Sequence, residues 1–247
     1  MMKFTIKPNG DSALRVAFKN EISEETNASV LALCRTVEDA AFRGIISCIP
    51  AYCTLLIEYD PLILNYQEAK QLVLSLKVDS LKQRCGRLVR IPTCYGGEYG
   101  PDLGEVAAQT GLTAEEVISR HTASLCRVYM LGFRPGFPYL GGMDESIAVP
   151  RRKTPRTSIA AGSVGIAGKQ TGIYPEASPG GWNIIGRTPL KLFSEKNRSL
   201  LQPGDMIQFC AVSSETYDLL VNDDSAVAEW TKYAENREFS TAREDDR

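Results

Sequence analysis

Alternating apolar and polar positions divide the first 86 residues into short strands and helices. Two alternating runs, 4–8 and 13–18, flank the turn-forming stretch Asn9-Gly10-Asp11-Ser12, which predicts a hairpin. Two further strands are predicted at 45–49 and 54–59, where prolines follow. The strands therefore come in two pairs.

Helical spacing follows each pair of strands. Ser23 is an N-cap candidate with two glutamates in the first turn, and apolar residues recur at helical spacing from Val30 to Gly44. Asn65 opens a second helix. The order β-β-α-β-β-α, with 87–91 as a candidate closing strand, predicts an α+β N-terminal domain of ferredoxin-like type over residues 1–86.

Short strands, two small helices and many turns characterise residues 87–212. Asp102 is expected to cap a helix over 103–109, and Thr113 with Glu116 forms a capping-box pair for a second helix reaching His121. Strands are expected at 125–131, 191–193 and 206–212. This pattern predicts a mainly-β barrel with long functional loops.

Residues 213–247 form an acidic extension with ten acidic and four basic residues. Helical turns are expected at 216–220 and 226–233, and the last eight residues are expected to be disordered.

Composition excludes several classes of protein. The 247 residues are 43% hydrophobic and 23% charged, as in a soluble globular chain. We find no signal peptide and no membrane span, and seven irregularly spaced cysteines suit a reducing cytoplasm. One histidine and no CxxC pair argue against a zinc site, and a pI near 5.7 argues against nucleic acid.

The run from Gly132 to Pro189 holds 11 of the 20 glycines and 7 of the 13 prolines. It carries seven Arg or Lys against three Asp or Glu, inside a chain of net charge −2. Such loops suit an anionic ligand or an acidic partner surface.

The glycine-rich segment 162–169 is not a phosphate loop. A P-loop needs glycine five positions before its Gly-Lys pair and Ser or Thr after it, but Ser163 and Gln170 occupy these positions. Backbone amides could still form an anion nest, and a plain β-turn is an equal alternative.

Arginines beside prolines are the first candidates for ligand contact. Arg151 and Arg156 are favoured for carboxylate or phosphate binding, and Arg134 is a candidate for either substrate or an interface. A solvated loop is the preferred interpretation of Arg152 and Lys153.

Polar and aromatic side chains supply the other candidates. His121 is expected to be a favourable cation at a helix end, or else the histidine of a catalytic step, and a triad with Ser163 is disfavoured. Gln170, Thr171 and Tyr174 could hydrogen-bond a lactam or ureido group. The loop aromatics, Trp182 among them, are barrel-core or anchoring residues in the simplest interpretation.

Seven collinear motifs resemble one family. They are CYGGEYGPDL, GLTAEEVISRHT, LGFRPGFPYLGG, PRRKTPR, AGSVGIAGKQTGIYP, SPGGWNIIGRTPLKLF and LQPGD. In this order they resemble the allophanate hydrolase subunit 1 family, densely over residues 88–210 and more loosely before. That family includes 5-oxoprolinase subunits and the kinase inhibitor KipI.

The resemblance implies a ferredoxin-like domain followed by a cyclophilin-like barrel. It implies a non-autonomous B subunit of an enzyme that uses ATP, with Mg, to open 5-oxo-L-proline to L-glutamate. The implied partners are a companion C subunit, similar to KipA, together with an A subunit, which is a lactam-utilisation protein. Alternatives are a KipI-like inhibitor of a sporulation histidine kinase and a component of a urea carboxylase or allophanate hydrolase system.

Residue types and motif positions together give a predicted site without a metal. The predicted catalytic residues are His121, Arg156 and Gln170. The predicted substrate-binding residues are Arg134, Arg151, Ser163, Thr171, Tyr174 and Trp182.

Overall fold

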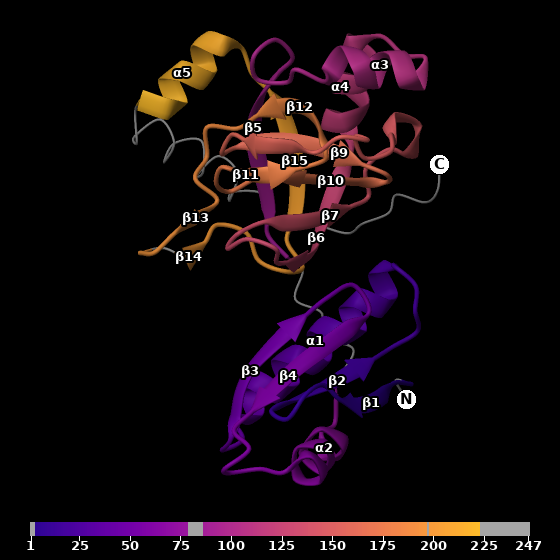
Figure 1. The fold of residues 1–247 in the computed structure, drawn as a ribbon, viewed down its shortest axis with the longest axis vertical. Helices are drawn as coiled ribbons and strands as arrows, with labels where there is room; N and C mark the ends of the chain where they lie inside the picture. The colour runs from indigo at the N-terminus through magenta and orange to yellow at the C-terminus, as the bar shows by residue number, and fades with distance from the viewer. Residues whose placement is uncertain (1–2, 79–85, 197, 223–247) are drawn as a thin grey trace, which may run out of the picture. The chain divides into compact units, whose positions relative to one another are not determined.

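The chain divides into two compact units, residues 1–84 and 85–247 (Figure 1). The computed structural model describes residues 3–78, 86–196 and 198–222. The helical turn predicted at 226–233 and the disorder predicted for the last eight residues lie outside the described residues.

The first unit is a four-stranded antiparallel sheet with two helices. The sheet order is β1-β2-β4-β3. Its elements are β1 (Thr5–Pro8), β2 (Ala13–Ala17), α1 (Glu24–Ala40), β3 (Ile45–Pro50), β4 (Thr54–Tyr59) and α2 (Tyr66–Ser75).

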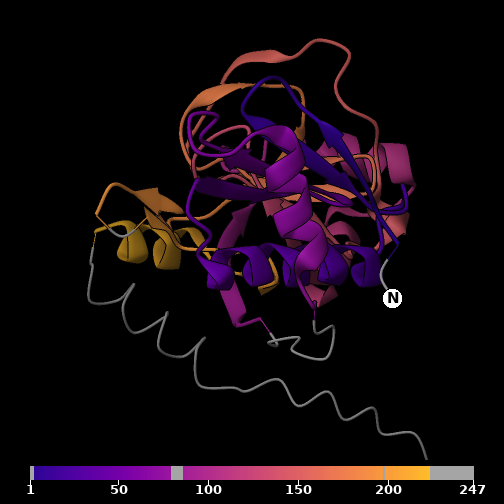
Figure 2. The same cartoon turned by 90° about the horizontal axis from the view of Figure 1, so that it is seen from below.

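One face of this sheet carries the core. Alternate residues such as Leu14, Val16 and Ile57 are buried in one cluster with residues of both helices. Both helices therefore cover the same face, where Figure 2 shows them together. The predicted caps are confirmed, because the Ser23 side chain accepts from the Thr26 amide and Asn65 forms a full capping box.

The strand expected to close this sheet at 87–91 belongs elsewhere. It is part of β5 (Leu88–Tyr95), which pairs with β12 and β15 of the second unit. The outer neighbour of β2 is instead β1, the first strand of the chain. The ferredoxin-like assignment stays a prediction.

The second unit is a closed barrel with the strand order β10-β7-β6-β15-β5-β12-β9, which confirms the predicted barrel. Its cyclophilin-like character stays a prediction. After β5 its elements are α3 (Leu103–Thr110), α4 (Ala114–Ala123), β6 (Leu125–Leu131), β7 (Pro138–Gly141), η1 (Glu145–Ile147), β8 (Arg156–Ile159), β9 (Ser163–Ala167), β10 (Gln170–Ile173), β11 (Ser178–Gly180), β12 (Asn183–Arg187), β13 (Phe193–Ser194), β14 (Arg198–Ser199), β15 (Met206–Ala211) and α5 (Ser214–Asn222).

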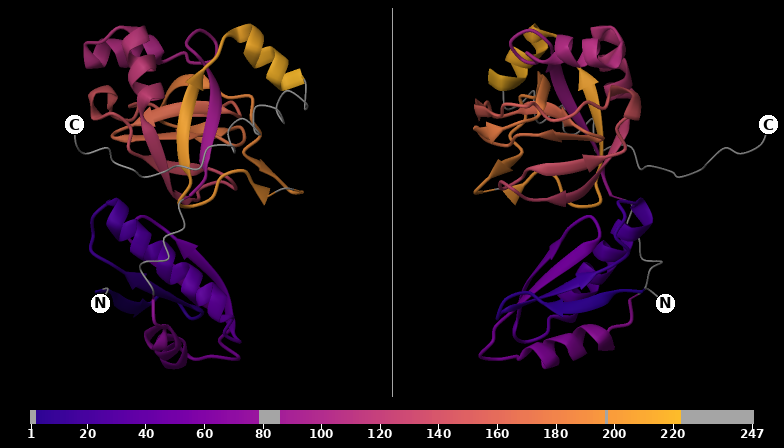
Figure 3. Two further views of the ribbon diagram at one scale, coloured as in Figure 1. Left: turned by 180° about the vertical axis from the view of Figure 1, so that it is seen from behind. Right: turned by 45° about the vertical axis from the view of Figure 1, so that its right-hand side comes forward.

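Strands distant in the sequence close the barrel. β15 pairs in parallel with β5 and antiparallel with β6, and Figure 3 shows β15 beside β5. Two small sheets, β8 with β11 and β13 with β14, lie outside the barrel. The strand expected at 191–193 is the two-residue β13, and the helix expected at 216–220 is the longer α5.

Candidate functional site

Aromatic side chains gather outside the barrel core around Phe137. Its ring centroid lies 5.0 Å from Tyr139, 5.3 Å from Tyr174 and 5.7 Å from Trp182. Phe137, Tyr174 and Trp182 are each at most 5% exposed. They form a packed cluster, the outer aromatic cluster, that is separate from the apolar core of the barrel.

Strand alternation places this cluster on the outer face of β9, β10 and β12. Val164 and Ile166 of β9 point into the barrel core, whereas Ala167 belongs to the outer cluster. Gly172 on β10 leaves room for the cluster, since a Cβ there would lie 2.9 Å from Trp182 Cζ3 and 3.3 Å from Phe137 Cζ. The outer layer therefore packs directly against the barrel backbone.

Tyr174 connects the outer aromatic cluster to the arginine-rich loop. The backbone N–H of Trp182 hydrogen-bonds its hydroxyl, and burial raises the pKa of that phenol while Arg151 and Arg156 oppose the rise. Arg151 itself is exposed, and within the described part of the chain it forms no ion pair. Gln170 shares the outer face of β10 with Tyr174 and is half-buried.

A buried carboxylate, Asp102, organises the neighbouring loop. Arg156 donates to it from both terminal nitrogens, at 2.7 and 2.8 Å, and Arg152 Nη1 donates at 2.7 Å. The Ile184 amide donates at 2.6 Å. The Asp102 side chain is only 4% exposed, so it joins β8, β12 and the start of α3 as one charge-assisted network.

Two expectations about this loop are wrong. Arg152 is not a solvated loop residue, because its guanidinium contacts Asp102 and also Glu105 at 3.2 Å. Asp102 precedes α3 as predicted, but its carboxylate makes no cap hydrogen bond, since the arginines and the Ile184 amide occupy it. Arg156, a predicted catalytic residue, is committed to the Asp102 carboxylate, which raises the pKa of its guanidinium. Its predicted role stays a prediction.

His121 lies in the barrel interior and is fully buried. Its Nδ1 lies 2.7 Å from the Tyr95 hydroxyl, and its Nε2 lies 2.9 Å from Thr171 Oγ1. The ring also packs on Phe209, with centroids 4.3 Å apart. Both ring nitrogens therefore have protein partners.

The hydrogen-bond chain fixes the tautomer of His121. Thr171 Oγ1 donates its proton to the Gly165 carbonyl, so it must accept from Nε2–H of His121. Nδ1 is then the acceptor for the Tyr95 hydroxyl, whose pKa burial raises well above its usual value. Tyr95, His121 and Thr171 therefore all have hydrogen-bond partners while the imidazole is neutral.

The expectation of a helix-end cation at His121 is wrong. Burial lowers the pKa of this imidazole to about 3, because the charged form would lose its hydration. Ser163 is not its partner either, since both ring nitrogens are bonded to Tyr95 and Thr171. The disfavoured serine triad therefore does not form.

Strand alternation separates the predicted site residues into two groups. Thr171 joins His121 in the interior, whereas Gln170 and Tyr174, one position before and three after it, lie with Trp182 on the outer face. Ser163 is buried on β9, at 1% exposure, in the outward register of that strand. Of the outer group, Ser163, Tyr174 and Trp182 are buried and Gln170 is half-buried, so Gln170 and the exposed Arg151 form the accessible part of the candidate site.

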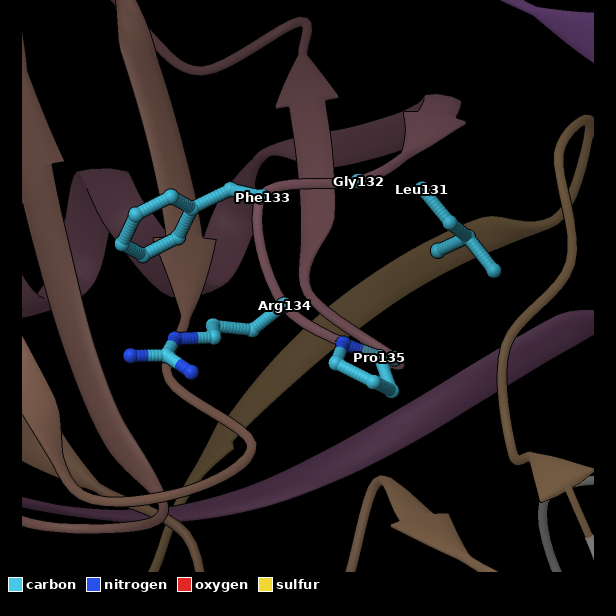
Figure 4. A pocket seen from close by; sticks show the side chains of 6 residues that line it. Leu131, Gly132, Phe133, Arg134 and Pro135 are labelled. Carbon is cyan, nitrogen blue, oxygen red and sulfur yellow. The ribbon is translucent and has the colours of Figure 1, made fainter.

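Arg134 marks the edge of this face. It lies in the loop between β6 and β7, where Figure 4 shows Phe133 and Arg134 extending to the same side, away from Leu131 and Pro135. Arg134 pairs with Glu176 at 3.3 Å, and both side chains are about half exposed (44% and 52%).

The glycine-rich segment 162–169 folds as a hairpin. Ala167 pairs with Gln170, so Gly168 and Lys169 form a two-residue turn in which Gly168 has φ 59°. Among the described residues, no group of three His, Cys, Asp or Glu side chains could hold a metal ion. No helix in the described ranges is long and apolar enough to cross a membrane.

Sequence reasoning missed three residues that shape the site: Asp102 as an ion-pair centre, Tyr95 as the partner of His121, and Phe137 as the centre of the aromatic cluster. No local signal identifies the first two, because their partners lie 26 to 82 residues away. The spacing of Phe137 and Tyr139 on alternate positions is the one signal available for the third.

Comparison with known proteins places the chain among characterised relatives. Residues 4–201 match the family described as carboxyltransferase domain, subdomain C and D. The chain is 45% identical over 234 residues to the 5-oxoprolinase B subunit of Bacillus subtilis, covering 87% of this chain and 96% of the relative.

Two solved structures extend the comparison. The crystal structure of TTHA0988 is 36% identical, with a TM-score of 0.74, and the match covers 85% of this chain and 41% of that longer protein. The urea amidolyase of K. lactis has a TM-score of 0.73 at 20% identity, covering 91% of this chain and 16% of that one, and shows the shared fold.

Proposed function

Because the chain belongs to the carboxyltransferase subdomain C and D family, we propose that it is the B subunit of an ATP-dependent 5-oxoprolinase. In this proposal it acts with two companions, a C subunit similar to KipA together with an A subunit. The observation that carries the proposal is the 45% identity to a 5-oxoprolinase B subunit, 96% of which the match covers.

The proposed reaction opens the lactam of 5-oxo-L-proline to give L-glutamate. One water adds across the lactam C–N bond, and a second is consumed as ATP is cleaved to ADP and phosphate. Amide resonance makes ring opening difficult, which is a chemical reason to couple it to ATP. A preorganised set of donors would stabilise the charge that develops on the lactam oxygen.

The outer face offers half of such a site. The exposed Arg151 guanidinium suits the substrate carboxylate, and the half-buried Gln170 amide suits the lactam N–H and C=O, while Tyr174 is buried in the outer aromatic cluster. The predicted interior residues His121 and Thr171 then maintain the barrel beneath these groups. We assign them no contact with substrate.

In the described residues, neither the glycine-rich segment nor a cluster of acidic side chains offers the usual site for ATP with Mg²⁺. The glycine-rich segment is a hairpin rather than a phosphate loop, and no cluster of metal-ligating side chains accompanies it in the described ranges. We therefore assign nucleotide binding to the companion subunits.

The test is reconstitution of the complex. The chain is co-expressed with its two companions, and glutamate formation and 5-oxoproline-dependent ATP hydrolysis are measured. We expect activity only with all three polypeptides, and we expect Arg151→Ala with Gln170→Ala to lower kcat/KM at least tenfold. Lys153→Ala, in the same exposed loop, is the matched control and should retain activity.

Three outcomes would contradict parts of the proposal. Turnover of 5-oxoproline by this chain alone would show that it is not a partial site. A reconstituted complex that hydrolyses ATP without producing glutamate would point to another substrate, such as a urea derivative. Full activity of the double variant would refute the site residues while leaving the proposed place in the complex intact.

A further inference from the structure

Phe133 is presented to solvent in an unusual backbone conformation. It has φ 69°, in the left-handed region that aromatic residues rarely adopt, and it is 62% exposed. It is the one aromatic side chain among the large exposed hydrophobic residues of the described chain. An exposed aromatic held in an unfavourable conformation indicates a functional constraint rather than packing.

The loop around Phe133 is rigidly held. The Gly132 amide donates to the Phe137 carbonyl at 3.1 Å, and the Phe137 amide donates to the Arg134 carbonyl at 3.0 Å. Gly136, at φ 81°, lies so close to the chain at 192–193 that a Cβ would be 2.8 Å from Phe193 Cβ. The backbone that carries Phe133 is therefore preorganised, so little backbone conformational entropy is lost when the loop binds.

The loop ends at the outer aromatic cluster and at basic side chains. The Phe133 ring meets Phe137 edge to face at 5.7 Å, and the Arg134 guanidinium lies 5.8 Å from the Phe133 ring centroid. The loop lines a shallow hollow of about 340 Å³, and Figure 4 shows the side chains that line it. Phenylalanine, arginine and an adjoining hollow match the composition of protein-interface hot spots.

Charge selects the kind of partner. Arg134 has an exposed ion pair with Glu176 that is weak and exchangeable, and Arg151 adds an exposed guanidinium near Tyr174 on the same outer cluster. A partner with an apolar hollow for Phe133 and carboxylates for Arg134 and Arg151 would complement this surface. A second copy of the same basic surface would not, because like charges would then face each other.

We propose that the loop 132–136, with Phe133 at its tip, is the docking site for the companion C subunit. This rests on the proposed function. The relative TTHA0988 supports the occupant, because a match to this chain accounts for only 41% of that polypeptide. In TTHA0988 the matching module is therefore covalently joined to additional protein. For the present chain, a separate polypeptide can take the place of that additional protein.

The test measures, by biolayer interferometry, how tightly the full chain binds the purified C subunit. Phe133→Gly should weaken the equilibrium affinity about 30-fold, as expected for a hot spot. Leu219→Ala, which removes another exposed hydrophobic side chain of the same unit, should change affinity less than threefold. Because glycine tolerates positive φ, Phe133→Gly should keep the melting temperature of the isolated chain.

Each outcome decides a different question. Wild-type binding that Phe133→Gly leaves unchanged overturns the docking site but retains the proposed place in the complex. Absence of wild-type binding to the C subunit overturns both. A concentration-dependent homodimer that Phe133→Gly abolishes identifies a second copy as the occupant and also overturns the proposal. A 30-fold loss with an unchanged melting temperature supports it.

Discussion

The Asp102 carboxylate shows how one buried charge can join three segments of a chain. Its two oxygens accept hydrogen bonds from Arg152, Arg156 and the Ile184 amide. Removing it would leave the partly buried Arg156 guanidinium without its counter-charge and would leave Arg152 with only the exposed Glu105.

Asp102→Ala should therefore lower the free energy of unfolding of the barrel by about 3–5 kcal/mol. Denaturant unfolding monitored by circular dichroism measures this. Glu105→Ala is the control, because that carboxylate is 54% exposed and contacts Arg152 from the rim of the same network. A loss below about 1 kcal/mol is expected for it. Equal losses in the two variants would contradict the buried-network interpretation.

The buried His121 should make barrel stability sensitive to acid. Its pKa is about 3 when folded and 6.5 ordinarily, so the unfolded chain binds the extra proton between these values. The contribution of neutral His121 is complete above pH 6.5 and decreases, by about 1.4 kcal/mol per pH unit, as pH falls towards 3.

The direct measurement is a proton NMR titration. His121 is the single histidine of the sequence, so its ring resonances are unambiguous. We expect them not to titrate between about pH 5 and 8, the range in which an ordinary imidazole does. A midpoint near 6.5 would show an accessible imidazole and would contradict the buried Tyr95–His121–Thr171 chain.

Sequence alone draws attention to Arg156 and His121 but does not identify their partners. Arg156 and His121 stand out in the sequence, yet the groups that control them, Asp102 and Tyr95, are remote from them along the chain. The local sequence predicts that the Asp102 carboxylate caps α3. The fold shows instead that the carboxylate binds Arg152 and Arg156 and makes no hydrogen bond to the helix amides.

At the scale of elements, the β9–β10 hairpin determines what the site can contain. Successive residues of β10 point to opposite faces, so Thr171 contacts His121 inside while Gln170 points outward. Gly172 makes the outer layer possible, because its missing side chain admits Trp182 and Phe137.

Gly172→Ala should destabilise the barrel by about 1–3 kcal/mol, since the new methyl group would overlap the aromatic layer. Gly104→Ala is the matched control: it lies in α3, where a methyl group would meet open space, so stability should be unchanged or rise by up to about 1 kcal/mol. Thermal unfolding compares the two. Similar melting temperatures would show that the aromatic layer adjusts freely.

Elements whose signals are local are predictable. The capping boxes at Asn65 and Thr113 are present with both hydrogen bonds, because a cap depends on residues three positions apart. The partner of β5 is not predictable in this way, because β5 pairs with β15, whose residues come more than 100 positions later, and no short-range pattern encodes that register.

At the scale of the molecule, two separate cores support two units. Leu55→Ala, in the fully buried core of the first unit, should cost about 2–5 kcal/mol there. The His121 ring resonances and the barrel transition should be unaffected, since the two cores have no residue in common. A matching loss in the barrel transition would show that the cores unfold together.

The pairing of β15 with both β5 and β6 also has a consequence for synthesis. The first unit is complete once residue 84 has emerged, and it can fold while the rest is being translated. The barrel must wait for Met206–Ala211, because until then β5 and β6 keep open edges where β15 will insert. Barrel closure is therefore a late and slow step, because it joins segments that are far apart in the sequence. A chain that ends before residue 206 would lack β15, and its open strand edges would make it prone to aggregation.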